Sequence, residues 1–476
     1  MSESRLTYSF FAWQELNMQE NLKLAFKDIV GSSNFTDQLI DLISYSYDAS
    51  DYDHRPEAGL WPTTTEQVSQ ILSLANEHRI PVTPRGAGTG LAGAAVPNQG
   101  GLVLDLCRMN KILEIRIADR LAIVQPGVVY ADLEGALSRY GFFFPPDPAS
   151  ASVCTLGGNV ATNAGGMRGA KYGVTRDYVM GLEVVLPNGR IMRTGSYCMK
   201  SSSGYDLTRL FVGSEGTLGV VTEIVLKIHP KPMATKTALA SFDDLQDSGQ
   251  AVIDVMHSGI IPSVLEILDP NTIRVLRDHG NIPLPEVMAM ILVETDGYTE
   301  AEASYQMERV TEVFKKNRVR DIKVAASPAE VEDLWRIRKS IGSVAATLRP
   351  RNVSEDVTVP ISRVPALVKG ISTIVEKHGL PFVVFGHAGD GNLHPRIMYD
   401  PADPDQVKHV NQAVAEIFRL TCDLGGTLTG EHGVGLSKAL YMTWEHDPLA
   451  LEMMRGIKRL FDPNNILNRG KMALEG

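Results

Sequence analysis

Cysteine is scarce in this sequence of 476 residues. The four cysteines, Cys107, Cys154, Cys198 and Cys422, are scattered, and no two of them form a Cys-x-x-Cys pair. This excludes a four-cysteine iron–sulfur cluster built by this chain alone without distant ligands. The scatter also gives no disulfide framework, which fits a reducing compartment.

Long apolar runs and excess positive charge are lacking as well. No run approaches the roughly 20 apolar residues of a membrane span, and the N-terminus has no apolar stretch of signal-peptide length. The formal net charge is −10, which argues against a nucleic-acid partner. We therefore expect a cytoplasmic protein. Peripheral association with the inner face of the membrane, through a partner subunit, stays open.

The chain is long enough for two or three domains with real cores. After Thr63-x-x-Glu66, which resembles a capping box, apolar residues follow helical spacing at Val68, Ile71, Leu72 and Ala75. Residues 80–83 are expected to be a strand, 112–115 and 121–124 a hairpin, and 130–140 a helix. Between residues 238 and 340, strands and helices are expected to alternate, which indicates an α+β substrate domain.

Three glycine-rich segments lie between residues 86 and 219. The first contains a literal G-x-G-x-x-G at Gly88, Gly90 and Gly93. A Rossmann site would need a helix directly after it, and Pro97 interrupts one, so we reject that interpretation. Successive glycines can still expose backbone N–H groups to phosphate, although a tight turn between strands is the plain alternative. The density of small residues from 154 to 166 and from 213 to 219 favours close approach of backbone to a flat ligand.

Two histidines flank a glycine turn in His387-Ala388-Gly389-Asp390-Gly391-Asn392-Leu393-His394. We expect His387 to end one strand and His394 to begin the next, so that both imidazoles face one point. Glu431 would complete a three-ligand, open site for zinc, manganese or iron(II). Histidines satisfied by backbone at a hairpin are the alternative.

The motifs, taken together and in order, resemble a known family. PRGAGTGLAG, PPDPAS, LGGNVATNAGG and GSEGTLGVVTE are similar to the FAD-binding half of the vanillyl-alcohol oxidase type of flavoproteins. GHAGDGNLHP, TGEHGVG and FDPNNILNRGK resemble the FAD-linked D-2-hydroxyacid dehydrogenases. That family includes bacterial D-lactate dehydrogenases, the flavin subunit of glycolate oxidase and D-2-hydroxyglutarate dehydrogenase.

The resemblance implies an α+β fold: a two-part FAD-binding domain, a ferredoxin-like cap for the substrate and a helical C-terminal segment. We place an N-terminal helical segment at 1–55, the FAD-binding domain at 56–232, the substrate domain at 233–425 and the completing segment at 426–476. Members that bind FAD covalently often carry a histidine in the first loop, where this chain has Thr89, so we expect non-covalent FAD. The implied FAD contacts are Pro84, Arg85, Gly86, Ala87, Gly88, Thr89, Gly90, Pro146, Asp147, Gly157, Gly158, Asn159, Thr162, Gly219, Val220, Val221 and Asn468.

The resemblance also assigns roles in the active site. His387, His394 and Glu431 match the metal ligands, and His432 matches the proposed base. An imidazole suits removal of a hydroxyl proton near neutral pH, although a structural histidine in a glycine turn is the alternative. Arg338 matches the arginine that binds the substrate carboxylate, against the alternative of a solvated helical arginine.

Two departures from the family bear on the substrate. Hydroxyglutarate enzymes carry a lysine where this chain has Ser354, which argues for a short monocarboxylate such as D-lactate or glycolate. They carry an asparagine where this chain has Arg396, which could itself meet a distal anion. Alternative functions are a glycolate oxidase flavin subunit, a D-2-hydroxyglutarate dehydrogenase and, outside this class, a metal-dependent hydrolase. The electron acceptor stays open among a quinone, a cytochrome, an electron-transfer flavoprotein and an iron–sulfur subunit, as does homodimerisation.

Overall fold

The computed structural model describes residues 18–475, and these fall into two compact units. Of the described residues, the glycine-loop unit contains 18–165, 173–230 and 431–475. The histidine unit contains residues 166–172 and 231–430. None of the helices among residues 18–475 has the length and apolar character that crossing a membrane requires.

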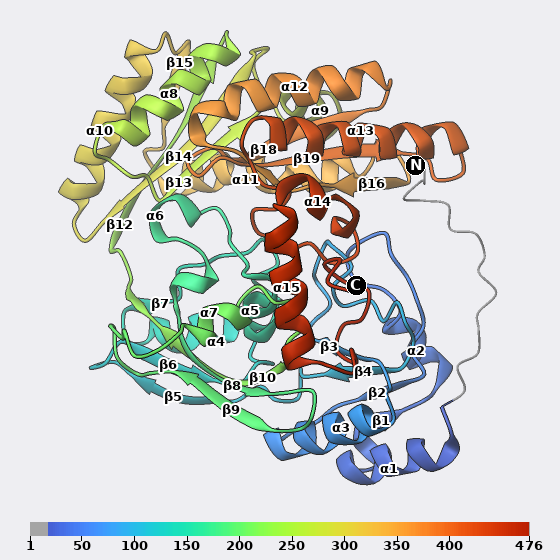
Figure 1. The fold of residues 1–476 in the computed structure, drawn as a ribbon. Helices are drawn as coiled ribbons and strands as arrows, with labels where there is room; N and C mark the ends of the chain where they lie inside the picture. The colour runs from blue at the N-terminus through green and yellow to red at the C-terminus, as the bar shows by residue number, and fades with distance from the viewer. Residues whose placement is uncertain (1–17, 476) are drawn as a thin grey trace. The chain divides into compact units, whose positions relative to one another are not determined.

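The glycine-loop unit contains a small sheet with the strand order β1-β2-β4-β3 (Figure 1). Strands β2 and β3 run parallel to β4. Helix α3 buries the apolar stripe of Val68, Ile71, Leu72 and Ala75, as its spacing predicts. The bounds are β1 Phe35–Thr36, β2 Ala58–Leu60, β3 Val82–Arg85, β4 Leu102–Asp105, α1 Glu20–Val30, α2 Leu39–Ser44 and α3 Thr65–Glu77.

The predicted capping box at the start of α3 is wrong by one residue. Thr64, not Thr63, is the N-cap, and its side chain accepts a hydrogen bond from the backbone N–H of Gln67. The side chain of Gln67 reaches back to the N–H of Thr63 at 2.8 Å. Gln67 therefore takes the part that the sequence pattern gave to Glu66.

A second, antiparallel sheet in this unit has the order β5-β6-β10-β8-β9. The predicted hairpin is confirmed as β5 and β6, and no helix follows the first glycine loop in residues 86–101. The bounds are β5 Ile112–Arg116, β6 Leu121–Val124, β7 Phe142–Phe143, β8 Val179–Val185, β9 Ile191–Gly195, β10 Val220–Lys227, β11 His229–Pro230, α4 Tyr130–Ser138, α5 Leu156–Thr162, α7 Leu207–Phe211, α14 Met442–Glu445 and α15 Pro448–Phe461.

The histidine unit is built on an eight-stranded sheet with the order β15-β12-β14-β13-β18-β19-β16, in which β17 also pairs with β19. The predicted alternation of strands and helices is confirmed. The bounds are β12 Ala234–Phe242, β13 Val264–Leu268, β14 Ala289–Gly297, β15 Asp321–Val324, β16 Arg351–Ser354, β17 Val357–Thr358, β18 Phe382–His387, β19 Asn392–Tyr399, α6 Gly169–Tyr172, α8 Leu245–His257, α9 Pro270–Gly280, α10 Glu300–Lys316, α11 Pro328–Ala345, α12 Val364–Lys377 and α13 Pro404–Asp423.

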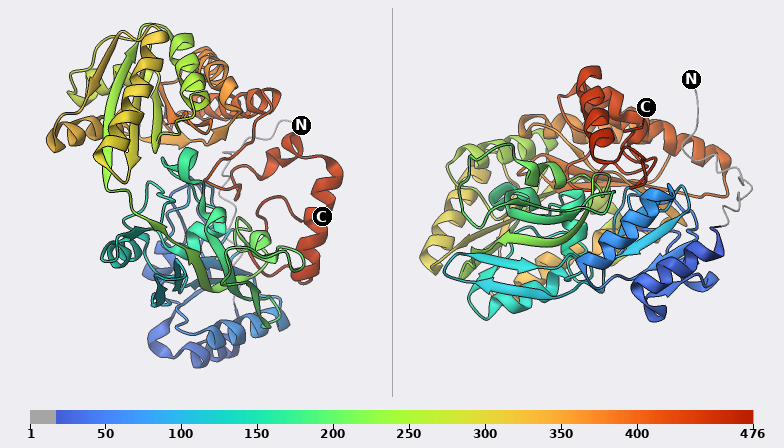
Figure 2. Two further views of the ribbon diagram at one scale, coloured as in Figure 1. Left: turned by 90° about the vertical axis from the view of Figure 1, so that its left-hand side faces the viewer. Right: turned by 60° about the horizontal axis from the view of Figure 1, so that its bottom comes forward.

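Helices cover both faces of this sheet. Helix α8 packs against α10 and α12, and α12 packs against α13 (Figure 2). Helices α9 and α11 pack together on the other face, where their apolar residues join Leu268, Val383, Phe385 and Met398. Side chains alternate between the faces of a strand, so His387 shares the face of Phe385. This face therefore carries both the apolar core and the histidines.

Candidate active site

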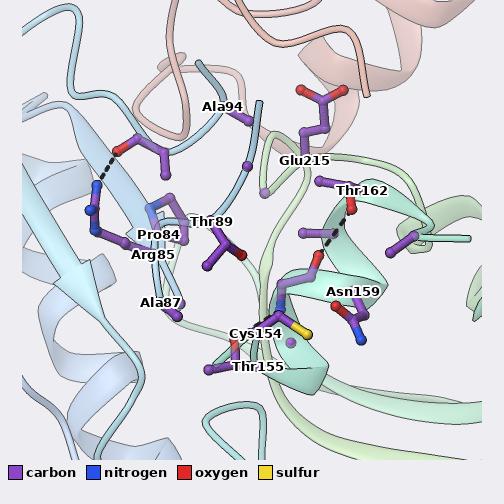
Figure 3. Close-up of a pocket in the computed structure, with 18 of the residues that line it drawn as sticks. Pro84, Arg85, Ala87, Thr89, Ala94, Cys154, Thr155, Asn159, Thr162 and Glu215 are labelled. Carbon is purple, nitrogen blue, oxygen red and sulfur yellow. Dashed lines mark hydrogen bonds between the residues drawn. The ribbon is translucent and has the colours of Figure 1, made fainter. Parts of the chain in front are cut away.

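A cavity of about 420 Å³ opens among the glycine segments of the glycine-loop unit (Figure 3). This volume lies within the range of about 300–1,000 Å³ that is usual for small-molecule sites. Pro146 and Asp147 are not among its lining residues, and Pro148 to Ser150 lie there instead. The other predicted FAD contacts all line it: Pro84 to Gly90, Gly157, Gly158, Asn159, Thr162, Gly219 to Val221 and Asn468.

Glycine stands at positions 157 and 90 of this cavity for two different physical reasons. At Gly157 a Cβ atom would lie 2.6 Å from the Cβ of Pro126, so no side chain fits between helix α5 and the turn that follows β6. At Gly90 a Cβ atom would meet only a carboxylate oxygen of Asp48, at 3.9 Å. The first glycine allows close packing of the protein, whereas the second leaves room beside an exposed stretch of backbone.

Arg85 is occupied by the protein itself. Its Nη1 atom donates to the carbonyl oxygens of Tyr47 at 2.8 Å and Ala95 at 3.3 Å. The side chain is buried and ties the first glycine loop to the segments on either side. Any contribution of Arg85 to a ligand would therefore come through its backbone.

Glu215 is a buried carboxylate in this cavity that the sequence analysis did not single out. Its two carboxylate oxygens accept hydrogen bonds from the backbone N–H groups of Val434 at 2.6 Å and Gly435 at 2.8 Å. Burial raises the pKa of Glu215, and these two N–H groups oppose the rise. Glu431 and His432 line the same cavity. Glu215 therefore fixes the turn that directly follows them.

The two predicted histidines come together in the histidine unit. His387 is the last residue of β18, and His394 lies near the start of β19. Their Nε2 atoms are 3.2 Å apart. Behind them lie two fully buried carboxylates: Glu266 bonds the Nδ1 atom of His387, and Asp356 Oδ1 lies 3.8 Å from the Nδ1 atom of His394.

This arrangement fits a pair of metal ligands. When each Nδ1 atom carries its proton toward a carboxylate, each Nε2 atom presents a lone pair to the other imidazole. Two lone pairs 3.2 Å apart repel each other, and a cation bound by both removes the repulsion. A carboxylate behind a histidine is the usual support of a metal-bound imidazole. Glu431 belongs to the other unit, so its place as the third ligand stays a prediction.

Arg338, on α11, shares Glu266 with His387. Its Nε atom donates to Oε2 of Glu266, while Oε1 bonds His387. The Arg338 guanidinium also stacks on the ring of Phe385, 4.6 Å from its centre. Burial alone would raise the pKa of Glu266, but the charges and hydrogen bonds of His387 and Arg338 outweigh it and lower the pKa to about 2. The carboxylate is therefore ionised at any physiological pH.

Arg396 lies two residues beyond His394 on β19, and on the same face of the sheet. Its Nη1 atom donates to the carbonyl oxygen of Gly342 on α11 at 3.3 Å. Burial and the neighbouring charge of Arg338 lower the pKa of Arg396. Both predicted substrate-binding arginines therefore lie in the histidine unit, close enough for their charges to interact.

Comparison with known proteins agrees with this picture. Residues 231–472 match the family model of the C-terminal domain of FAD linked oxidases, and residues 56–195 match a FAD binding domain. The chain belongs to the FAD-linked oxidases. The glycolate oxidase subunit GlcD of Bacillus subtilis (strain 168) is 45% identical over 95% of this chain and 97% of its own length. A D-lactate dehydrogenase of Anaerostipes hadrus is 36% identical over 88% of this chain and 90% of its own.

Solved structures give the fold. A crystal structure of p-cresol methylhydroxylase with substrate bound covers 95% of this chain and 96% of its own, with a TM-score of 0.80 and 21% identity. A 4-ethylphenol oxidase from Gulosibacter chungangensis has a TM-score of 0.75 and 20% identity, with 95% and 96% covered. The predicted fold class, α+β with a FAD-binding part of the vanillyl-alcohol oxidase type, is confirmed.

The cavity suits the FAD that this family binds. Asn159 is 3% exposed, and its Nδ2 atom makes no hydrogen bond within residues 18–475, so it is a buried donor that a ligand acceptor would satisfy. The space beside Gly90 leaves backbone of the first glycine loop open to a ligand. The FAD-linked oxidase would hold its flavin cofactor here through main chain and a few small polar side chains.

Two buried carboxylates beside the histidine pair were not predicted as site residues from the sequence. Glu266 is the one charged residue in the buried strand Val264–Leu268, which was a usable signal. Asp356 lies in the segment that was compared with the hydroxyglutarate enzymes, and it accepts hydrogen bonds from Asn392, Thr429 and Gly430. Their partners in the sequence are too distant for a local motif to reveal them.

Proposed function

We propose that this FAD-linked oxidase oxidises a short D-2-hydroxy acid, with D-lactate as the expected substrate, to the 2-oxo acid. The observation that carries the proposal is that Glu431 and His432 line the same cavity as all three glycine segments. A base and a flavin site then share one chamber of the glycine-loop unit. The names of the relatives, D-lactate dehydrogenase and glycolate oxidase subunit, support the substrate class.

His432 is the proposed base. Oxidation of a hydroxy acid requires removal of the hydroxyl proton and transfer of a hydride from the neighbouring carbon, and bound FAD supplies the hydride acceptor. A neutral imidazole accepts a proton near pH 7. Glu215 holds the amides of Val434 and Gly435, so it would keep the His432 turn in one conformation.

One divalent metal, zinc, manganese or iron(II), is the second proposed component. His387 and His394 would bind it through their Nε2 atoms, and the sequence motif assigns the third place to Glu431. A bound metal stabilises an alkoxide, which eases departure of the hydroxyl proton. Arg338 and Arg396 would bind the carboxylate of the substrate.

The proposal assigns the domains as follows. Residues 56–232 would bind FAD with the help of residues 426–476, and residues 233–425 would provide the substrate and metal groups. The segment 1–55 would be an N-terminal extension, of which residues 18–55 are described. The protein would be cytoplasmic and would pass electrons to a separate acceptor. The word "subunit" in the name of the Bacillus relative supports a partner in that step.

The direct test is anaerobic mixing of the purified holoenzyme with a panel of acids while flavin absorbance is recorded. The panel contains D-lactate, L-lactate, glycolate, D-2-hydroxybutyrate and D-2-hydroxyglutarate. Bleaching of the flavin by D-lactate but not L-lactate supports the proposal, and absence of bleaching with every acid refutes it. His432→Ala should slow reduction by about 100-fold or more, the usual range for loss of a general base. Reduction at the wild-type rate would refute the role of His432.

A metal-dependent hydrolase is the competing function from another class. Glu431 and His432 would then activate water, and the bound flavin would be a bystander. Flavin bleaching separates the two functions because a hydrolase transfers no electrons.

A further inference from the structure

The guanidinium of Arg396 lies against Gly342 of α11, where the absence of a side chain leaves room for it. Its Nη1 atom bonds the carbonyl of Gly342, and a Cβ atom at Gly342 would lie only 3.1 Å from that nitrogen. Gly342 is four residues after Arg338 on α11, so the two positions share one face of the helix. The guanidinium of Arg396 therefore lies along the same helix face that carries Arg338.

Arg396 has no counter-ion in the part of the chain that the structure describes. It makes no ion pair there, and its buried Nε atom makes no hydrogen bond there. Both oxygens of Glu266 are engaged, by Arg338 and His387. Asp356 is engaged by Asn392, Thr429 and Gly430.

A half-buried guanidinium without a partner is costly for the folded protein unless a ligand completes it. Arg338 and Arg396 carry two positive charges, and Glu266 offsets one. The remaining single positive charge matches one carboxylate. The buried Nε–H group without a hydrogen bond belongs to Arg396, so a carboxylate oxygen would bind in the direction of that group.

We propose that Arg396 is the principal anchor of the substrate's single carboxylate, with Arg338 as the second arm of the clamp. This inference rests on the proposed function and makes it more specific. Glu266 already balances Arg338, so the carboxylate of a 2-hydroxy acid supplies the charge that Arg396 lacks. The site therefore selects a monocarboxylate. A neutral analogue such as the amide loses this contact, and a second carboxylate finds no further unbalanced charge among Arg338, Arg396 and Glu266.

The test compares Arg396→Met and Arg396→Lys with the wild-type holoenzyme. Loss of a hydrogen-bonded charged contact corresponds to about 10- to 100-fold. For Arg396→Met we expect that increase in the KM for D-lactate with a small change in kcat. The preference for D-lactate over its neutral amide, D-lactamide, should fall by the same factor. Added guanidinium should restore part of the D-lactate activity in Arg396→Met. Arg396→Lys, which keeps the charge, should lie between the two.

Arg336→Met is the matched control, because Arg336 is on the same helix but its side chain is 68% exposed and pairs with Asp333 at the surface. It should leave both KM values unchanged. Thermal melting shows whether each variant folds. Calorimetric titration of the holoenzyme with pyruvate measures binding without turnover. It therefore tests the role of Arg396 separately from the proposed function, which would be refuted if no acid reduced the flavin.

Two results would overturn the proposal. One is a folded Arg396→Met enzyme that binds pyruvate and uses D-lactate within about twofold of the wild type. The other is a wild-type preference for D-2-hydroxyglutarate that Arg396→Met abolishes while D-lactate oxidation is unchanged. That second pattern would mean that Arg396 binds a distal carboxylate.

Discussion

Replacement of Glu266 by glutamine tests whether one carboxylate orients both His387 and Arg338. Glu266 is fully buried and accepts from Arg338 Nε and His387 Nδ1. A glutamine offers one acceptor oxygen and one donor NH₂ group in the same space. Since the Nε–H of Arg338 can only donate, it takes the oxygen, and the NH₂ group then faces His387.

That arrangement forces a change of tautomer at His387. Its Nδ1 atom must become an acceptor, so the ring proton moves to Nε2, the atom that lies 3.2 Å from Nε2 of His394. A protonated Nε2 atom cannot bind a metal. We expect Glu266→Gln to weaken metal binding by about 10- to 100-fold, the usual effect of losing a supporting carboxylate. Metal content after dialysis, measured by mass spectrometry, checks this.

The same variant should be less stable. Breaking a buried ion pair from one side costs about 3 kcal/mol or more. For a unit of roughly 200 residues this corresponds to a melting temperature lower by about 6–12 °C. Glu294→Gln is the matched control: one oxygen of Glu294 accepts from both Thr237 and Trp335, and a glutamine oxygen can do the same.

Burial raises the pKa of Glu294, so folding disfavours its charged form, and the neutral amide should not destabilise the protein near pH 7. The control should keep its metal and its melting temperature. If Glu266→Gln also keeps both, Glu266 sets neither the tautomer of His387 nor the charge balance of Arg338.

Three further predictions concern the glycine-loop unit. Because Thr89 stands where covalent members carry histidine, acid precipitation should release all FAD into the supernatant, and flavin in the pellet would contradict this. In Gly157→Ala the new Cβ atom would clash with Pro126, so FAD affinity in fluorescence titration should fall at least about 10-fold. The control is Gly135→Ala, whose new Cβ atom meets no atom within 4 Å. This control should bind FAD normally, and its free energy of unfolding should rise by up to about 1 kcal/mol. Burial lowers the pKa of Lys471 to about 7, although the charges of Asp48 and Glu215 oppose this shift, so above pH 7 the unfolded state binds more protons than the folded state. The free energy of unfolding, measured by chemical denaturation, should therefore rise from pH 7.5 to 9.5 by up to about 1.4 kcal/mol per pH unit. The slope should be smaller in Lys471→Met.

Local patterns predicted much of the fold because periodicity and turns are local properties. The stripe on α3, the β5–β6 hairpin and the strands that carry His387 and His394 follow from spacing of apolar residues and from glycine turns. The cap of α3 was placed one residue early, since Thr63 and Thr64 are equivalent by composition. Only the backbone conformation distinguishes them.

The groups that orient the site were beyond the reach of local patterns. Glu266 is 121 residues from His387 and 72 from Arg338. Glu215 is 219 residues from the Val434 amide that it binds. Pairings over such separations depend on the order of strands in a sheet or on the return of the C-terminal segment, and neither leaves a periodic signal. Family motifs predicted the groups that would contact substrate and metal, whereas only the structure identified Glu266 and Glu215, the carboxylates that hold their surroundings in place.

If His387 binds the proposed metal and Arg338 the substrate, the position of Glu266 would link metal binding and substrate binding thermodynamically. A metal held by Nε2 of His387 would make the Nδ1–H more acidic, which would strengthen its hydrogen bond to Glu266. The same carboxylate would then pair less strongly with Arg338, which would leave more of that guanidinium's charge for the proposed substrate. By reciprocity, a substrate carboxylate bound to Arg338 would strengthen the hydrogen bond between Glu266 and His387. Arg396 has no ion pair within residues 18–475, so its proposed contact with the substrate would not depend on this exchange.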